Sequence, residues 1–286
     1  MIVVTGAAGK TGSAAIRALA SRGALVRAMV RRPDQVAVVR AAGAAEAVEA
    51  DLRDEEALRM AMRGASAVYH ICPNVHPDEV AIAQRVIDAA RRAGASRIVY
   101  HSVLHPQIEA MPHHWNKLRV EEHLFESTLP YTILQPAAYM QNLLAGWDLI
   151  LRHGIYRVPY ASETKLGMVD LADVAEVAAR ILTESGHDFG VYELAGPEVL
   201  DQGDVADALG RHLGRPVQVE VVPLERWTAE ARQAGLGEYQ VSALRQMFCY
   251  YERYGFWGSP RVLTWLLGRP PTTLSTFLER IGRPNQ

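Results

Sequence analysis

The sequence opens with an apolar run that leads directly into a glycine-rich turn, and this pairing constrains the fold more than any other feature. Met1–Thr5 is followed by Gly6, Gly9 and Gly12. After a strand and before a helix, glycines at this spacing allow a sharp turn, a close approach of pyrophosphate to the backbone and tight packing of the helix. Free N–H groups at the helix start then face the phosphates. We therefore expect a dinucleotide-binding turn, with a ligand-free glycine turn as the alternative. The expected contacts are Thr5, Gly6, Ala8, Gly9, Lys10, Thr11 and Gly12.

Short apolar runs alternate with helical patterns through the first half of the chain. The runs expected to form strands are Leu25–Val30, Glu46–Ala50, Ala67–Ile71, Arg97–Ser102 and Tyr131–Gln135. This alternation predicts a parallel sheet covered by crossover helices, because short turns cannot join parallel strands. We expect an α/β protein with a Rossmann-type, doubly wound parallel sheet that binds ligands beyond the carboxyl ends of its strands.

The alternation loosens after residue 153, which predicts two interleaved domains. Residues 1–153 are expected to bind the nucleotide, and segments near 166–196 are expected to return to this domain. The returning segments are the strands Leu166–Val169 and Val191–Ala195 and the helix Leu171–Thr183. Residues 154–286 are expected to form a smaller, mostly helical lobe that binds the substrate. Most of its aromatic residues are expected to lie in its core; these are Trp227, Tyr250, Tyr251, Tyr254, Phe256, Trp257 and Trp265.

Composition argues against several other classes of protein. The net charge of −2 is spread without a long block of Lys or Arg, so nucleic acid is not expected as a partner. Cys72 and Cys249 follow no metal-binding or redox spacing, which fits a reducing compartment. No segment has the pattern of a signal peptide or a membrane span. We expect a cytoplasmic protein that acts on a small molecule.

Two arginines stand where the second expected strand ends. Arg31 lies nineteen residues after Gly12, where an NAD-binding protein usually carries an Asp or Glu for the ribose 2′-hydroxyl. The guanidinium groups of Arg31 and Arg32 instead suit a 2′-phosphate, because a planar fork can bind several phosphate oxygens. We expect NADP(H) as the cofactor, with NAD(H) possible. A solvent-exposed pair before Pro33 and Asp34 is the structural alternative.

The ends of the third and fourth expected strands supply further candidates. Asp51 could bind the exocyclic amine of adenine while Leu52 packs on its ring, although Asp51 or Asp54 would also suit the N-cap of a helix at Glu55–Met62. The residues that end the fourth strand are expected to border the ribose and pyrophosphate, and these are Ile71, Cys72, Pro73 and Asn74.

With these residues considered together, the chain resembles the NmrA-like group of the atypical short-chain dehydrogenase/reductase superfamily over its whole length. The resemblance rests on the glycine motif, Val26–Arg31, His101-Ser102-Val103, Lys117 with Glu121, and Tyr131–Pro136 leading to Asn142. It implies a Rossmann-type domain, a smaller C-terminal lobe and a nicotinamide cofactor in the cleft between them. It also implies that the segment with Pro136, Ala137 and Tyr139 covers the nicotinamide, with Tyr139 or Asn142 near the substrate. A packed ring is the alternative for Tyr139.

One catalytic position departs from the family pattern. Family members that reduce by the usual route use Ser, Tyr and Lys, with the Tyr four residues before the Lys. Here Ser102 and Lys117 match, but His113 occupies the tyrosine position. The resemblance implies that Lys117 binds the ribose hydroxyls. His113 or His114 could replace the phenol as acid, because an imidazole with a pKa of about 6.5 changes protonation near neutral pH. Alternatively, both could flank a helix that begins near Trp115.

A metal site is not expected, since the nearby histidines lack zinc-helix spacing and no carboxylate joins them. These histidines are His101, His105, His113 and His114. The expected function is an NAD(P)H-dependent oxidoreductase acting on a small aromatic, quinone-like or conjugated carbonyl compound. Its catalytic candidates are Ser102, His113, His114, Lys117 and Tyr139. The missing tyrosine leaves two alternatives: a non-catalytic NADP(H) sensor that contacts a protein partner, or an unusual biosynthetic oxygenation or isomerisation.

Overall fold

Residues 1–282 are described by the computed structural model, and they divide into two compact units. The first unit contains Met1–Gln107, His113–Gln135 and Ala172–Tyr192. The second contains Ile108–Pro112, Pro136–Leu171 and the described residues from Glu193 onward. The units are therefore interleaved along the chain. The position near residue 153, where the sequence suggested a domain boundary, lies inside the second unit.

The first unit is built on a seven-stranded sheet in the order β10-β6-β5-β4-β1-β2-β3. Its strands are β1 (Ile2–Val4), β2 (Val26–Val30), β3 (Glu46–Glu49), β4 (Ala67–His70), β5 (Arg97–His101), β6 (Tyr131–Pro136) and β10 (Gly190–Leu194). β1 pairs in parallel with β2 on one side and with β4 on the other. The strand order therefore reverses beside β1, which is the switch point where doubly wound sheets bind ligands. The expected Rossmann-type fold is confirmed.

One expected strand joins a different sheet. β9 (Leu166–Val169) does not return to the seven-stranded sheet. It pairs in parallel with β7 (Ala138–Tyr139) and antiparallel with β11 (Val199–Leu200). The prediction for Leu166–Val169 was wrong because β7, which follows β6 almost at once, offers backbone groups that satisfy this strand. The expected return of Val191–Ala195 to the main sheet is confirmed by β10.

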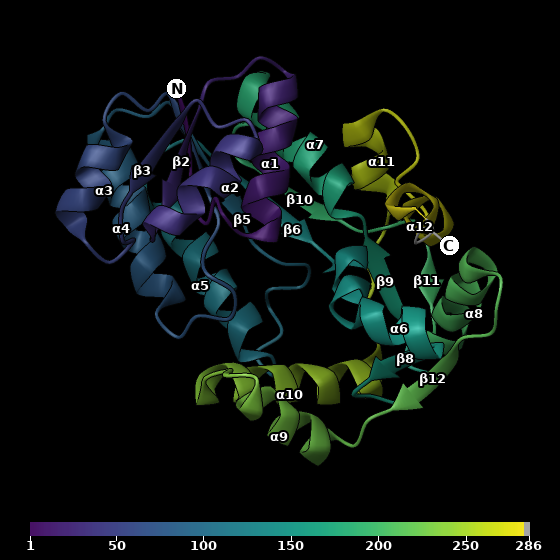
Figure 1. The fold of residues 1–286 in the computed structure, drawn as a ribbon. Coiled ribbons are helices and arrows are strands. Elements are labelled where there is room, and N and C mark those ends of the chain that lie inside the picture. The colour runs from purple at the N-terminus through teal and green to yellow at the C-terminus, as the bar shows by residue number, and fades with distance from the viewer. Residues whose placement is uncertain (283–286) are drawn as a thin grey trace. The chain divides into compact units, whose positions relative to one another are not determined.

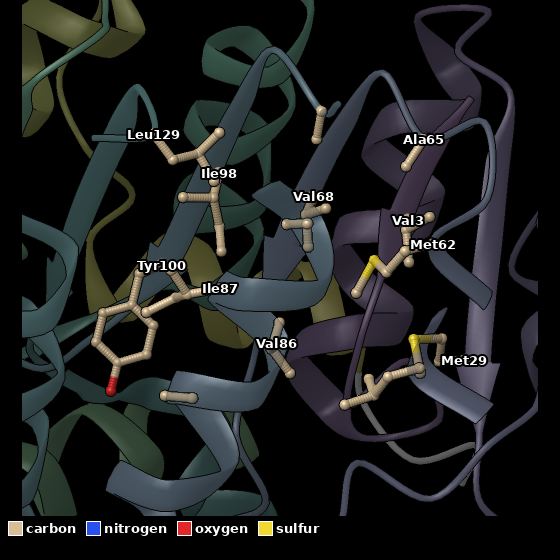
Figure 2. Packing of buried hydrophobic residues seen from close by; sticks show 14 of the residues in the cluster. Val3, Met29, Met62, Ala65, Val68, Val86, Ile87, Ile98, Tyr100 and Leu129 are labelled. Carbon is tan, nitrogen blue, oxygen red and sulfur yellow. The ribbon is translucent and has the colours of Figure 1, made fainter. Parts of the chain in front are cut away.

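Helices cover both faces of the main sheet, as Figure 1 shows for α3 and α4 on one side and α1 on the other. The helices that flank this sheet are α1 (Lys10–Ser21), η1 (Pro33–Gln35), α2 (Val36–Ala41), α3 (Glu55–Met62), α4 (Glu79–Arg92), α5 (Pro112–Glu126) and α7 (Leu171–Thr183). A buried apolar cluster joins α3, α4 and α5 to the strands, and it includes Val68, Ile87 and Ile98 (Figure 2). Burial of this cluster from water is the main stabilising contribution on this face.

The ends of the helices follow simple capping rules. Asp54, rather than Asp51, is the N-cap of α3, and its carboxylate accepts hydrogen bonds from the N–H groups of Glu56 and Ala57. Gly94 follows α4 with a φ of +72°, a left-handed conformation that glycine adopts without a steric penalty. α5 begins at Pro112 instead of near Trp115, because proline is favoured in the first helical position. His113 and His114 therefore lie inside the helix.

The second unit combines two small sheets with helices. β8 (Ile155–Val158) pairs in parallel with β12 (Gln218–Val221). The remaining elements are η2 (Met140–Gly146), α6 (Trp147–His153), α8 (Gln202–Leu213), α9 (Leu224–Gln233), α10 (Glu238–Tyr254), α11 (Arg261–Leu267) and α12 (Leu274–Ile281). Leu209, Phe277 and Leu278 are central to its apolar cluster.

The aromatic residues of this unit are less buried than the sequence suggested. Only Tyr251 and Phe256 of the seven are buried, whereas Trp265 is 67% and Tyr254 54% exposed. The helix geometry of α10 explains part of this difference. Tyr250 and Tyr251 point about 100° apart; Tyr251 is buried, and Tyr250 is half-buried. Tyr250 instead packs on Tyr254, with ring centroids 4.8 Å apart. Within residues 1–282, no helix has both the length and the apolar character needed to cross a membrane.

We expect Leu58→Ala to lower the free energy of unfolding by about 2–5 kcal/mol, because Leu58 is fully buried in the cluster beneath α3. Leu25→Ala removes the same atoms from a side chain that is 62% exposed and is the matched control. Urea denaturation followed by circular dichroism measures both variants. Equal losses of stability would contradict this placement of the core.

Candidate active site

The glycine turn after β1 is packed too closely for side chains. Gly6 has a φ of +58°, and a Cβ there would lie 2.7 Å from the carbonyl oxygen of Ile71. A Cβ at Gly12 would lie 2.4 Å from the carbonyl oxygen of Gly6. The Gly9 N–H donates to the same Gly6 oxygen at 3.1 Å. Through these contacts the turn packs against the end of β4, and the start of α1 packs against the turn.

The start of α1 has the properties of an anion-binding site. Its N-cap is Gly9, and for this helix the described residues provide neither a side-chain cap nor an acidic residue in the first turn. The first N–H groups of a helix need acceptors, and its dipole favours a negative charge. Together with the glycine turn, this helix start fits the pyrophosphate of a dinucleotide. Lys10 is exposed beside it, and Ala8 and Thr11 are half-buried.

Thr5 has a structural connection at the same place. It is fully buried, and its hydroxyl lies 2.9 Å from His70 Nδ1 and 3.1 Å from the Ile71 carbonyl oxygen. The Ile71 N–H donates to Thr5 Oγ1 at 2.9 Å. These bonds join the ends of β1 and β4, so the Thr5 hydroxyl is engaged within the protein.

The two arginines after β2 differ in their environment. Arg32 makes a two-pronged ion pair with Asp34, with Nε–Oδ1 and Nη2–Oδ2 distances of 2.9 and 3.0 Å. The Gln35 side-chain oxygen accepts the backbone N–H groups of Arg31 and Arg32. In the described part of the chain, no hydrogen bond or ion pair involves the Arg31 guanidinium. Arg31 is therefore the better candidate for a 2′-phosphate.

Asp51 is held by a neighbouring arginine. Its carboxylate accepts the Arg53 backbone N–H at 2.9 Å and the Arg53 guanidinium at 3.0 and 2.7 Å. These hydrogen bonds lower the pKa of Asp51 to about 2. Leu52 is half-buried and packs against the apolar cluster of the first unit. The expected roles of both residues at adenine stay predictions.

The loop after β4 combines burial with backbone strain. Ile71 and Cys72 are buried, whereas Pro73 and Asn74 are exposed. Burial raises the pKa of the Cys72 thiol, so this side chain stays protonated. Val75 has a φ of +47°, which is unusual for a β-branched residue and costs on the order of 1–3 kcal/mol. Such strain is concentrated at functional loops, and this loop begins at the switch point of the sheet, where β4 lies beside β1.

Lys117 lies in a set of buried polar contacts. Its ammonium donates to Glu79 Oε1 at 2.6 Å and to the His101 carbonyl oxygen at 3.1 Å. It also lies 5.3 Å from the centroid of the Tyr100 ring. Tyr100 donates its hydroxyl to Glu79 Oε1 at 3.0 Å. The structure therefore places Lys117 beside the end of β5, next to Ser102.

Ser102 is bound to a second buried carboxylate. Its hydroxyl donates to Glu121, which also accepts the Gln135 side-chain amide at 3.0 Å on each oxygen. Burial raises the pKa of Glu121, and these hydrogen bonds counteract the shift. His113, Lys117 and Glu121 are spaced four residues apart along α5, so they share one face of the helix.

The histidine pair in the first turn of α5 is buried and uncharged near neutral pH. Burial lowers the pKa of His113 to about 4 and that of His114 to about 3, with nearby positive charge adding to each shift. His114 Nδ1 donates to the His105 carbonyl oxygen at 3.3 Å. His113 Nδ1 is buried and has no hydrogen-bond partner in the described chain. Desolvation of both rings thus disfavours the charged imidazolium, and their role as the acid stays a prediction.

Pro136, Ala137 and Tyr139 belong to the second unit. The Ala137 N–H donates to the Leu194 carbonyl oxygen at 3.0 Å. Tyr139 is half-buried, and its backbone pairs with Val169 of β9. Asn142 is exposed in η2. Their roles beside the nicotinamide and substrate stay predictions.

Sequence reasoning missed Glu79, the direct partner of Lys117. An acid in the first turn of a helix is common because it interacts favourably with the helix dipole. Glu79 therefore resembled an ordinary helix start. No local sequence pattern shows that α4 and α5 bring Glu79 and Lys117 together. The pair becomes apparent only in the folded structure, where Glu79 is buried against Lys117.

Comparisons with known proteins agree with this geometry. The model of the NmrA-like family matches residues 1–278. The chain belongs to the NmrA-like family. It is 31% identical to an NAD(P)H azoreductase from Xenophilus azovorans, covering 97% of this chain and 96% of that protein. It is 29% identical to quinone oxidoreductase 2 from Escherichia coli, covering the whole of both chains.

A solved structure supports the same assignment. The E. coli NADPH-dependent quinone oxidoreductase QOR2, complexed with NADPH, has a TM-score of 0.85 and 29% identity to this chain. The comparison covers 98% of this chain and 99% of that one. This NmrA-like chain thus has a tightly packed glycine turn and Lys117, while a buried histidine stands where the family pattern leads one to expect a catalytic tyrosine.

We expect Gly12→Ala to destabilise the protein by about 1–3 kcal/mol and to weaken NADPH binding, because the new methyl group would overlap the Gly6 carbonyl. Gly146→Ala is the control, since a Cβ there would meet no atom within 4 Å. Urea denaturation and a fluorescence titration with NADPH measure the two effects. Tolerance of alanine at both positions would refute the close packing of the turn.

We expect the free energy of unfolding to fall as the pH decreases from 7 to 5. The folded-state pKa is lowered to about 3 for His70 and His101, to about 4 for His113 and to about 3 for His114. Below a pH of about 6.5, protons therefore bind these histidines in the unfolded chain but not in the folded one. At pH 5.5 each one costs about 1.4 kcal/mol of stability.

Two variants isolate this effect in urea denaturation at pH 7 and 5.5. His114→Gln should reduce the loss of stability between the two pH values by about 1 kcal/mol. His153→Gln changes an exposed histidine and should leave the loss as it is in the wild type. The same pH dependence in all three proteins would show that the buried imidazoles take up protons without unfolding.

Proposed function

We propose that this chain is an NADP(H)-dependent reductase of small quinone-like, aromatic or conjugated carbonyl acceptors. The observation that carries the proposal is its full-length similarity to quinone oxidoreductase 2 and NAD(P)H azoreductase. The chain's own nucleotide turn is also intact. Similarity of fold alone would not determine the reaction, whereas similarity along the whole length to two named reductases supports it.

Residues of the first unit would hold the cofactor. The turn at Gly6–Gly12 and the start of α1 suit the pyrophosphate, and the Arg31 guanidinium suits the 2′-phosphate. Lys117 presents a fixed positive charge beside Ser102. When bound, the nicotinamide supplies the hydride, and the protein contributes orientation and electrostatics.

The missing tyrosine favours an acceptor that needs little help from an acid. A hydroquinone is a phenol, and a phenol such as that of tyrosine has a pKa of about 10. Its oxyanion is therefore tolerated in water until solvent supplies a proton. The alkoxide from a simple ketone is far more basic and needs a proton as it forms. Neutral His113 does not carry the extra proton of an imidazolium, so this site suits quinone-like acceptors better than simple ketones.

Positive charge from Lys117 supports the same choice. A fixed ammonium stabilises an oxyanion that develops nearby, and it does so best where water is excluded. The Lys117 side chain is 16% exposed, and its partner Glu79 is 1% exposed. Lys117 would thus stabilise the developing negative charge electrostatically without giving up its proton.

The test is oxidation of NADPH by the purified full chain with a panel of quinones, azo dyes and simple ketones, followed at the nicotinamide absorbance band. We expect turnover with quinones or dyes and little with ketones. Arg31→Ala should raise the dissociation constant for NADPH about 10- to 100-fold, as expected for loss of a charged hydrogen bond, and should change NADH binding little. Arg32→Ala is the matched control and should have a smaller effect, because Asp34 already binds that guanidinium.

Two results would contradict the proposal. Tight NADPH binding without turnover on any acceptor would favour a sensor. Equal loss of NADPH and NADH affinity in Arg31→Ala would refute the 2′-phosphate assignment.

A further inference from the structure

The buried ion pair between α4 and α5 is the feature that the proposed reaction does not yet explain. Glu79 is almost fully buried at the start of α4, and it accepts both the Lys117 ammonium and the Tyr100 hydroxyl on one oxygen. A buried carboxylate is costly unless it is paired and hydrogen-bonded. Glu79 meets both conditions, and its place in the first turn of a helix stabilises its charge further.

We propose that Glu79 is a positioning residue that keeps the Lys117 ammonium charged and fixed in the cofactor site. This inference rests on the proposed function, because it assigns a role to Lys117 in nucleotide binding. It adds a residue that neither the glycine motif nor the Ser–Lys pattern includes.

The charges around Lys117 support this assignment. The titratable groups that interact with it from β4, β5, α5 and the loop after β4, besides Glu79, are His70, Tyr100, His101, His113, His114, Cys72 and Glu121. Burial keeps the histidines, Tyr100 and Cys72 neutral: it lowers the pKa of the histidines and raises the pKa of Tyr100 and Cys72. Among the described residues around Lys117, Glu79 and Glu121 are then left to balance the ammonium.

Of these glutamates, Glu79 is the direct partner. Glu121 accepts Ser102 and the Gln135 amide, and no hydrogen bond joins it to Lys117 among the described residues. Glu79 Oε1 is 2.6 Å from Lys117 Nζ. Without Glu79, burial and the loss of the opposite charge would both favour the neutral amine.

The geometry of the ammonium points to its use. An ammonium has three N–H donors, and Lys117 directs one to Glu79 and one to the His101 carbonyl oxygen. Within residues 1–282 the third donor has no acceptor. An ammonium held on two sides with one donor left over is suited to bind an incoming hydroxyl group, such as a ribose hydroxyl of the nucleotide.

The composition of the chain makes this testable without catalysis. The chain has only three lysines, Lys10, Lys117 and Lys165. Protein labelled with carbon-13 at the lysine ε position therefore gives three signals, which Lys117→Met assigns. Each signal reports its own titration in the cofactor-free protein, with Lys10 and Lys165 as internal references.

The decisive comparison is wild type against Glu79→Gln, which keeps the hydrogen-bonding shape and removes the charge. We expect the titration midpoint of the Lys117 signal to fall by about one to three pH units, while the other two signals stay unchanged. As the pH is raised, the dissociation constant for NADPH should therefore begin to increase at a lower pH in Glu79→Gln than in the wild type. The difference should match the shift of the Lys117 midpoint. Glu56→Gln, which removes an exposed carboxylate paired with Arg59, is the control and should change neither measurement.

The outcomes separate the inference from the proposed function. An unchanged Lys117 midpoint in Glu79→Gln would overturn the inference, and so would a shifted midpoint with an unchanged pH dependence of NADPH binding. Failure of the wild type to bind NADPH or to reduce any acceptor would overturn the proposed function, whatever the Lys117 signal does.

If Glu79→Gln does not fold, Glu79→Asp keeps the charge on a shorter side chain. It should leave the Lys117 midpoint near the wild-type value while weakening NADPH binding, and a midpoint as low as that of an unpaired buried lysine would overturn the inference.

Discussion

The close contact between the first turn and the end of the neighbouring strand is the constraint on which the site depends. Gly6 lies against the Ile71 carbonyl and Gly12 against the Gly6 carbonyl, with no space for a Cβ at either position. Thr5 adds a hydrogen-bonded connection between the same two strands. These contacts place the start of α1, the end of β2 and the loop after β4 around the switch point of one sheet. The residues of the first unit that are expected to bind the nucleotide therefore lie near one another.

A second constraint is electrostatic and lies deeper in the same unit. One face of α5 carries His113, Lys117 and Glu121; His113 and Glu121 are buried, and the Lys117 side chain is 16% exposed. Desolvation keeps the histidine neutral, while Lys117 is paired with a carboxylate from α4. The helix therefore has one strongly held charge where the family pattern has a phenol and a lysine acting together. Under the proposed function, histidine in place of tyrosine would restrict the acceptors to those that need little help from an acid, while the residues expected to bind the nucleotide are still present.

Much of this could be predicted from the sequence, and the successes share a physical cause. Apolar runs, glycine spacing and helix caps are local, so the strands of the main sheet, the helix Leu171–Thr183 and the glycine turn after β1 were all foreseen. The failures concern partners that are distant in the sequence. Leu166–Val169 was recognised as a strand but assigned to the wrong sheet, because hydrophobicity does not specify which backbone it pairs with. Glu79 and the lowered pKa of His113 depend on burial, which no spacing reveals.

The buried thiol after β4 has a chemical consequence if the chain reduces quinones, as proposed. A quinone is an electrophile as well as an oxidant, and it adds readily to thiolates. Cys72 lies in the loop that borders the nucleotide candidates, yet burial raises its pKa and keeps the sulfur protonated and weakly nucleophilic. The chain can thus have a cysteine at this loop without offering a thiolate to the compounds it would reduce. Under the proposed function, desolvation of Cys72 would protect the protein from covalent damage by a quinone substrate.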